Sequence, residues 1–305
     1  MSREGFSPED RKGAWWSTDS RRAYSGKAFE VVAEKLGKLE RPDLSGFEHV
    51  QMGLRMEATI GRFAEEELGF QCKALGDAVA IHPKHEWLRS HGDFLSADRT
   101  ALVECKNYNA LHINYYSEPG DPVRVPDADW AQCCHEAACW GVDTVYLAVL
   151  FGGQRFRTYR LDFTPDDKDA LIQRMAKLWA SVQTGTLPEP ESPTQARIAY
   201  PIGGPGVAVA NSEVEHAAKR LAGVKASIKA FEQEEEKLAG MLQRIMGEAS
   251  ELQSADGRTL ATWKNSKPTK RFSASLFRQA MPDIYEQFVI ESPGDRRFLL
   301  KEKAE

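Results

Sequence analysis

The chain has 305 residues, of which 42% are hydrophobic and 28% are charged, and its formal net charge is −5 at pH 7. A chain of this length can bury a sizeable core and form two domains, while its acidic balance excludes a small, uniformly basic nucleic-acid binder. The longest apolar run, residues 145–151, is far shorter than the roughly 20 residues that cross a membrane. The charged N-terminus has no apolar segment of the signal-peptide type, so we expect a cytoplasmic protein with no membrane partner.

The first 185 residues alternate between helix-like and strand-like patterns. In chain order, the spacing of apolar residues and the turn signals predict helices over 26–37 and 50–68, strands over 77–82, 92–97 and 100–107, a helix over 127–140, strands over 143–151 and 154–163, and a helix over 165–184. Gly69 and Gly141 are typical residues for ending a helix. This order predicts an α/β domain over residues 1–185, with a mixed sheet flanked by helices.

The cysteines are odd in number: Cys72, Cys105, Cys133, Cys134 and Cys139. Because nothing else indicates an oxidising compartment, we expect reduced thiols. The spacing of the last three matches no iron–sulfur ligand pattern, and we interpret them as core thiols on a helix.

The C-terminal part differs in composition from the first domain. Residues 186–211 are rich in Pro and Gly and are interpreted as a linker. Residues 212–305 then form a mainly helical extension, which begins with Ser212 and Glu215 at the spacing of a capping box. Apolar residues follow a heptad seam, interrupted only by Glu235: Leu221, Val224, Ile228, Phe231, Leu238, Leu242, Ile245, Ala249 and Leu252. The seam fits either self-association or packing within the same domain.

The end of the chain contains a small basic and aromatic region. Its cations include Lys264, Lys267, Lys270 and Arg271, and aromatic residues such as Trp263 and Phe272 lie between or beside them. Basic side chains mixed with aromatic ones suit contact with a nucleic-acid backbone and stacking on bases. A solvated basic loop is the alternative interpretation.

The stretch ALVECKNYN, residues 101–109, places Glu104 and Lys106 on a strand that begins with apolar residues. A strand turns every second side chain to the same face, so these two charges share one. Burying them costs free energy unless a metal or a substrate needs them. Asp93 lies eleven residues before Glu104, and a hairpin that turns near residues 98–99 would bring the two carboxylates together. Carboxylates, backbone carbonyls and water are the ligands that Mg²⁺ or Mn²⁺ prefers, and Lys106 could position an attacking water.

Two further sets of residues bear on this centre. Glu57 lies on the predicted helix 50–68 and is flanked on its own face by residues with little or no side chain: Gly53, Gly61 and Ala64. A bound group can therefore approach its carboxylate closely. Three histidines flank Asp93, namely His82, His85 and His91. They could form a zinc site, but the carboxylates and the lysine already account for the centre, so we interpret them as exposed loop histidines.

Longer stretches resemble a known family. The segments VQMGLRMEATI, HPKHEWLRSHGDF, LVECKN and WAQCCHEAACWGVDTVYLAVLFGGQRF, together with SRRAYSGKAF near the N-terminus, follow in this order over about residues 15–185. They resemble the YqaJ-type viral recombinases, the family of lambda exonuclease within the PD-(D/E)XK nuclease superfamily. The resemblance implies a PD-(D/E)XK nuclease-like fold. One departure is local: the family has Pro before and Gly after the aspartate, whereas Gly92 and Phe94 flank Asp93 here.

The resemblance also implies roles for single residues. Asp93 and Glu104 would bind the metal together with the carbonyl of Cys105. Lys106 would be the catalytic lysine, and Glu57 the helix glutamate of the centre. In DNA or phosphate binding, Gln132 matches the glutamine on the helix after the lysine strand, and either Arg21 or Arg22 is the N-terminal arginine.

By this resemblance, the chain is expected to be a phage-type, Mg²⁺-dependent DNA exonuclease in which Mn²⁺ can substitute. It would digest duplex ends in the 5′-to-3′ direction and leave 3′ single strands for recombination. Its partners would be double-stranded DNA ends, a single-strand annealing protein and further copies of itself in a ring, such as a trimer, in a bacterial host. The alternatives are an endonuclease of the same superfamily and a non-catalytic DNA-binding or scaffold protein.

Overall fold

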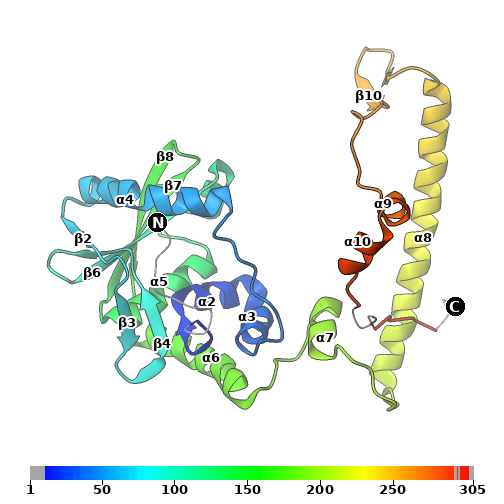
Figure 1. Ribbon diagram of the computed structural model, residues 1–305. Helices are drawn as coiled ribbons and strands as arrows, with labels where there is room; N and C mark the ends of the chain where they lie inside the picture. Colours follow the sequence, from blue (N-terminus) through cyan, green and yellow to red (C-terminus); the bar gives the residue numbers. More distant parts are fainter. Residues whose placement is uncertain (1–10, 292–293, 295, 302–305) are drawn as a thin grey trace. The chain divides into compact units, whose positions relative to one another are not determined.

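The computed structural model describes residues 11–291, 294 and 296–301. The chain divides into two compact units, residues 1–201 and 202–305 (Figure 1), which are described separately below. The first unit is a mixed α/β structure, as expected, and the second is mainly helical. Among the described residues, no helix has the length and apolarity needed to cross a membrane.

A five-stranded mixed sheet forms the centre of the first unit, in the order β2-β5-β6-β7-β8. The strands are β2 (Cys72–Ala74), β5 (Phe94–Ser96), β6 (Ala101–Tyr108), β7 (Thr144–Phe151) and β8 (Arg155–Asp162). Only β6 and β7 pair in parallel, and the helix α5 (Asp127–Trp140) lies in the crossover between them. The strand β7 and the beginning of β6 are mainly apolar, because helices cover the two faces of the sheet. The predicted strands over 100–107, 143–151 and 154–163 are confirmed.

Two layers of helices cover this sheet. On one face, Ile60 and Ala64 of α4 (Glu48–Leu68) pack with Val103, Ala148 and Leu150. On the other face, α5 and α6 (Pro165–Thr184) enclose the larger core, which includes Leu102 and Leu147. All three helices end at a glycine with positive φ: Gly69 at 73°, Gly141 at 70° and Gly185 at 71°. The predicted extents of these helices are confirmed to within two residues.

A second, three-stranded sheet carries the segment that leads to Asp93. Its order is β1 (Trp15–Trp16), β4 (His85–His91) and β3 (Val79–His82). The sequence predicted β3 but not β4, and Asp93 therefore follows a strand rather than starting one over 92–97. The interpretation of the three histidines as exposed loop residues is wrong. His82 and His85 are half-buried in strands with rings 4.9 Å apart, and His91 is half-buried at the end of β4.

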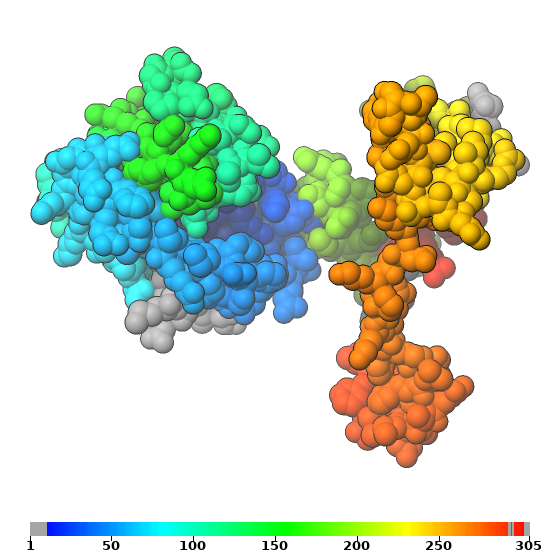
Figure 2. Space-filling view, turned by 90° about the horizontal axis from the view of Figure 1, so that it is seen from above, coloured from blue at the N-terminus to red at the C-terminus, as the bar shows by residue number. Residues whose placement is uncertain are grey.

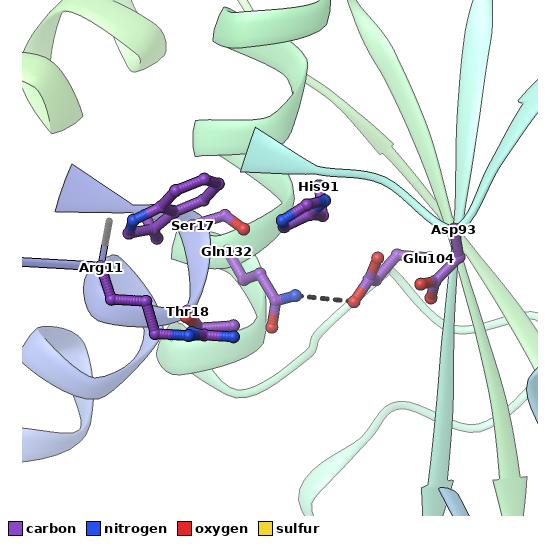
Figure 3. A pocket seen from close by; sticks show the side chains of 8 residues that line it. Arg11, Ser17, Thr18, His91, Asp93, Glu104 and Gln132 are labelled. Atoms are coloured by element: carbon purple, nitrogen blue, oxygen red, sulfur yellow. Dashed lines mark hydrogen bonds between the residues drawn. The ribbon is translucent and has the colours of Figure 1, made fainter. Parts of the chain in front are cut away.

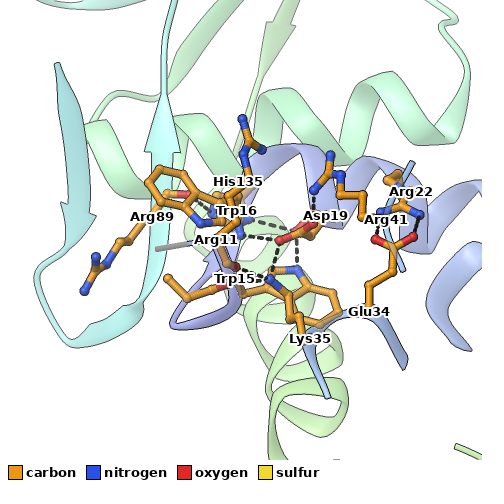
Figure 4. Close-up of polar contacts among 12 residues, drawn as sticks. Arg11, Trp15, Trp16, Asp19, Arg22, Glu34, Lys35, Arg41, Arg89 and His135 are labelled. Atoms are coloured by element: carbon orange, nitrogen blue, oxygen red, sulfur yellow. Dashed lines mark hydrogen bonds and ion pairs between the residues drawn. The ribbon is translucent and has the colours of Figure 1, made fainter. Parts of the chain in front are cut away.

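The N-terminal segment packs into this unit through buried polar contacts (Figure 4). It comprises α2 (Ser17–Arg22), a π-helical turn (Ala23–Lys27) and α3 (Ala28–Lys35), so the helix predicted over 26–37 is shorter than expected. Trp15 Nε1 donates to Ser20 Oγ over 3.1 Å, and Ser20 Oγ lies 2.8 Å from His135 Nδ1. His135 Nε2 lies 3.1 Å from the carbonyl oxygen of Arg89. This chain of hydrogen bonds links α2, α5 and β4.

The segment expected to be linker is partly helical. Within residues 186–211, α7 (Pro193–Ala199) forms, and Gln195 Nε2 donates to Glu30 Oε1 over 3.2 Å. The first compact unit therefore continues to residue 201 instead of ending at 185.

The second unit is built on one long helix, α8 (Ser212–Met246). A hairpin of β9 (Glu251–Gln253) and β10 (Thr259–Thr262) follows, and then the short helices α9 (Ala274–Ala280) and α10 (Pro282–Gln287). Two expectations are corrected here. Asn211 is the N-cap, because its Oδ1 accepts from the Val214 amide over 2.9 Å, and Ser212 is the first helical residue. Since α8 ends at Met246, Ala249 and Leu252 lie outside its seam.

The buried His135 predicts a pH dependence of stability. Burial lowers its pKa from 6.5 to about 4. The unfolded chain therefore binds more protons between these values, and the folded state loses stability as the pH falls through this window. We expect the free energy of unfolding to drop by about 2 kcal/mol more between pH 7 and pH 5 in the wild type than in His135→Asn. Urea titrations followed by tryptophan fluorescence measure this difference, and equal pH slopes in the two proteins would contradict it.

Candidate active site

Glu104 and Lys106 face α5 from the buried strand β6. Lys106 Nζ donates to Glu104 Oε1 over 2.6 Å, and Glu104 is only 4% exposed. The register explains the shared face, because Glu104 pairs with Leu147 and Lys106 with Val149, both of which belong to the core on the α5 side. The two charges therefore compensate each other inside the protein, where an unpaired charge would be costly.

Asp93 reaches the same point from the neighbouring strand. The strands β5 and β6 form the predicted hairpin, with Phe94 opposite Val103 and Arg99 at a φ of 62° in the turn. Asp93 Oδ2 accepts a hydrogen bond from the Cys105 amide over 2.8 Å. In an extended strand the N–H and C=O of one residue point to the same edge, so the Cys105 carbonyl also faces the Asp93 side.

Gln132 on α5 connects this centre to a further carboxylate. Its Nε2 donates to Glu104 Oε1 over 2.6 Å and to Glu136 Oε1 over 2.9 Å (Figure 3 shows the first contact). Glu136 is fully buried at 0% exposure. The sequence analysis missed this residue, although its spacing of four from Gln132 places both on one face of a helix.

Burial raises the pKa of two carboxyl groups in this centre, Glu104 and Glu136. Burial, followed by the charges of Asp93 and Glu136, raises the pKa of Glu104 well above its usual value, while Lys106 opposes this change. Burial also raises the pKa of Glu136 to about 7. The pKa of Lys106 is lowered by burial but raised more strongly by its neighbours, chiefly Glu104, so the amine is held in its charged form. Crowded carboxylates of this kind are stabilised by an additional cation.

The donors present suit a hard divalent cation. Among the described residues, no group of three or more His, Cys, Asp or Glu side chains forms a metal cage. Asp93 and Glu104 with the Cys105 carbonyl would instead hold Mg²⁺ through oxygen atoms and leave positions for water and phosphate. Mg²⁺ is commonly bound in this way, by one or two carboxylates together with substrate phosphates.

A cavity of about 120 Å³ lies next to the carboxylates. It is lined by Asp93, Glu104 and Gln132 and, from other segments, by Arg11, Trp16, Ser17, Thr18 and His91 (Figure 3). The rings of Trp16 and His91 stack at 5.0 Å with an angle of 9°. The sequence assigned no site role to these N-terminal residues, because no spacing along the chain relates them to a hairpin more than 70 residues away.

The structure distinguishes the two candidate arginines. Arg22 donates from both terminal nitrogens to Glu34, each over 2.6 Å (Figure 4). Arg21 instead donates to Asp129 Oδ1 over 2.8 Å and to the Tyr108 hydroxyl over 2.9 Å, and its side chain is 38% exposed. Its charge also acts on Lys106, which places it beside the centre. Of the two arginines, Arg21 is therefore the one that lies beside the centre.

The remaining candidates are Glu57 and four basic residues of the second unit. Glu57 is on α4, which covers the opposite face of β6. The pKa of the Cys105 thiol is raised mainly by burial, then by the charges of Asp93 and Glu104, and also by the charge of Glu57. It approaches the centre from the side of Cys105 and not from that of Glu104. The exposed residues Lys264, Lys267, Lys270 and Arg271 belong to the second unit.

Comparison with known proteins gives one curated relative. No family model matches the chain. An uncharacterized protein, YqaJ of Bacillus subtilis (strain 168), is 22% identical over 314 residues, which cover 99% of this chain and 95% of YqaJ. The chain is similar to YqaJ over nearly the full length of both proteins. This full-length similarity confirms the resemblance to YqaJ-type proteins.

Solved structures also resemble this chain. An alkaline exonuclease, LHK-Exo from Laribacter hongkongensis, gives a TM-score of 0.43 at 15% identity, over 57% of this chain and 92% of that one. A phage related exonuclease from Haemophilus somnus 129PT gives 0.38 at 12% identity, over 54% and 79%. Superpositions this partial carry no functional argument of their own.

Replacement of Asp93 tests the proposed cation site. Asp93→Asn retains the size of the side chain and an oxygen that accepts from the Cys105 amide, but it removes a charge. We expect Mg²⁺ to raise the melting temperature of the wild type and not that of the variant, because a ligand stabilises only the state that binds it. Without Mg²⁺ the variant should be at least as stable as the wild type, since one of several repelling carboxylates is neutral.

The matched control is Glu86→Gln, which removes an exposed carboxylate from β4. It should respond to Mg²⁺ as the wild type does. An unchanged Mg²⁺ response in Asp93→Asn would remove this residue from the site.

Proposed function

We propose that this protein is a Mg²⁺-dependent DNA exonuclease of phage type that degrades duplex ends in the 5′-to-3′ direction. The product would be a 3′ single strand for recombination. The observation that carries the proposal is the placement of Asp93, Glu104 and Lys106 around the Cys105 backbone, beside a cavity. This arrangement suits hydrolysis of a phosphodiester.

Each polar group has a defined task in this reaction. Mg²⁺ held by Asp93, Glu104 and the Cys105 carbonyl would stabilise negative charge on the phosphate and lower the pKa of a bound water. The Lys106 ammonium, which donates to Glu104 Oε1 over 2.6 Å, lies where it would also donate a hydrogen bond to the attacking water or to a phosphate oxygen. Gln132 orients the Glu104 carboxylate through the hydrogen bond of 2.6 Å that its Nε2 donates to Glu104 Oε1.

Digestion of linear duplex DNA labelled at either end, with and without Mg²⁺, tests the proposal. Loss of the 5′ label before the 3′ label, only with Mg²⁺, is the expected result. A closed circular duplex should remain intact. Cleavage of the circle would indicate an endonuclease, and binding without cleavage a non-catalytic DNA-binding protein.

In this proposal, Arg21 recognises the 5′-terminal phosphate. Asp129 and Tyr108 hold its guanidinium in place, and a guanidinium binds phosphate through paired, charge-assisted hydrogen bonds. We also propose that copies assemble in a ring around DNA and deliver the single strand to an annealing protein. The basic segment with Lys264, Lys267, Lys270 and Arg271 would contact that strand.

End recognition can be tested with a pair of arginine variants. Wild-type enzyme should digest 5′-phosphorylated ends about tenfold faster than 5′-hydroxyl ends, because one charge-assisted pair is worth about 1.5–3 kcal/mol. Arg21→Lys should lose most of this preference, since an ammonium cannot form the paired bonds. Arg22→Lys, the matched control, should keep the preference, because both terminal nitrogens of Arg22 already donate to Glu34. Equal wild-type rates on both ends, or digestion from 3′ ends, would refute this role of Arg21.

The role of the basic segment predicts a change in salt dependence. Lys267→Gln with Lys270→Gln should weaken binding of single-stranded DNA and reduce the slope of log K against log salt by about 1.4, because each phosphate contact contributes about 0.7. Fluorescence anisotropy at several salt concentrations measures this slope. Lys219→Gln with Lys229→Gln on α8 removes the same charge elsewhere in the unit and should leave the slope unchanged. Equal effects of the two pairs would indicate a non-specific charge effect.

A further inference from the structure

The second unit buries almost none of its apolar side chains. Of its residues between 202 and 301 that the structure describes, only Ala222 and Met246 are buried. The short helices α9 and α10 lie apart from α8 in Figure 2, where α8 is yellow and the other two are orange to red. A continuous exposed apolar surface on a long helix is typical of a protein–protein contact site.

With Met241 as an exception beside it, nine exposed apolar residues of α8 follow one line over the whole helix. In heptad positions a and d they are Val214, Ala217, Leu221, Val224, Ile228, Phe231, Leu238, Leu242 and Ile245. Phe231 is 70% exposed and Ile245 63% exposed. This line fits the seam of a two-stranded coiled coil, in which each residue packs between residues of a facing helix.

The charges on α8 argue against a parallel pair in register. The seam is interrupted at an a position by Glu235, which would then face Glu235 of the second copy. Arg220 at position g would likewise face Lys225 at position e. Like charges at these positions disfavour pairing, and a carboxylate pair in an apolar seam is especially costly.

An antiparallel pair removes these conflicts. If Ile228 lies opposite Phe231 of the second copy, Val214 lies opposite Ile245, so the overlap extends over nearly the full helix, residues 212–246. Glu235 then faces Val224 of the second copy, and Lys225 beside it can reach Glu235 or Glu232.

The overall charge distribution agrees with this direction. The N-terminal half of α8 has an excess of basic residues, with Lys219, Arg220, Lys225 and Lys229 against Glu213 and Glu215. The C-terminal half has an excess of acidic residues, with Glu232, Glu234, Glu235 and Glu236 against Lys237 and Arg244. Only an antiparallel arrangement brings the basic half of one copy to the acidic half of the other. Opposed helix dipoles are favourable in the same direction.

We propose that two copies of this chain associate through an antiparallel coiled coil of their α8 helices, with Ile228 opposite Phe231. The contact uses only the second unit and does not depend on nuclease activity. In this arrangement, the exposed seam of one α8 helix packs against the same seam of a second copy.

Cysteine cross-linking determines both pairing and direction. Leu221→Cys and Leu238→Cys, each on a full-length chain and distinguished by a mass tag, are mixed and mildly oxidised. In the antiparallel register residues 221 and 238 of different copies are opposite, whereas two residues 221 are about 25 Å apart along the helix. We expect a disulfide between the two variants in the mixture and none with either variant alone. The unsubstituted chain, oxidised in parallel, measures the background from the five native cysteines.

A second pair of variants tests the seam itself. When Ile228→Glu and Leu242→Glu are introduced into both cysteine variants, the yield of the mixed disulfide should fall at least tenfold, because buried unpaired carboxylates oppose packing. Gln233→Glu with Gln243→Glu adds the same charge outside the seam and should leave the yield unchanged. Disulfides within each single variant would establish a parallel pair, and no disulfide in the mixture would show that α8 does not pair with itself. Either result would overturn the proposal.

Discussion

The charge balance on β6 is the constraint on which the centre of the first unit depends. A lysine cannot be buried on a core strand unless an anion accompanies it, and Glu104 supplies that anion at 2.6 Å. Glu104 in turn lies close to Asp93 and Glu136, whose charges raise its pKa. Three carboxyl groups thus lie close to one ammonium group. Carboxylate oxygens of this kind are donors that suit a divalent cation.

The helix α5 links this centre to the rest of the unit. It is almost entirely buried, yet it carries Asp129, Gln132, His135 and Glu136, and each has a partner. Asp129 accepts a hydrogen bond from Arg21, and Gln132 donates one to Glu104. His135 connects α2 to β4 through its two ring nitrogens. One helix thus positions the carboxylate centre and the N-terminal segment that lines the cavity. The buried polar contacts favour one relative placement of these elements, because a mismatch would leave polar groups unpaired.

The second unit follows a different principle. Its helix is long and heptad-patterned, but its apolar residues are exposed in the single chain, and the short elements after it bury little. A helix of this kind derives little stability from propensity alone, and most of its stability depends on what covers its apolar face. The two units therefore differ in how they are stabilised: the first encloses its own core, and the second presents a surface that a second copy complements.

Local patterns in the sequence were sufficient for much of the fold. The helices α4, α5 and α6, the strands β6, β7 and β8, and the hairpin that joins Asp93 to Glu104 follow from short-range periodicity and from glycine at helix ends. The alternation of side chains on one strand likewise places Glu104 and Lys106 on a shared face. These features depend on neighbours a few residues apart, which a single sequence displays directly.

Contacts between distant segments were decided only by the tertiary structure. The short strand β1 has too few residues for a periodic pattern, and β4 was not predicted. The contact of the buried Glu136 with Gln132, the different partners of Arg21 and Arg22, and the cavity wall formed by Trp16 and His91 all depend on which elements pack together. The same reason explains why Glu57 approaches β6 from the other face. Spacing along the chain places a residue on a face of its own helix or strand, but only packing determines what that face contacts.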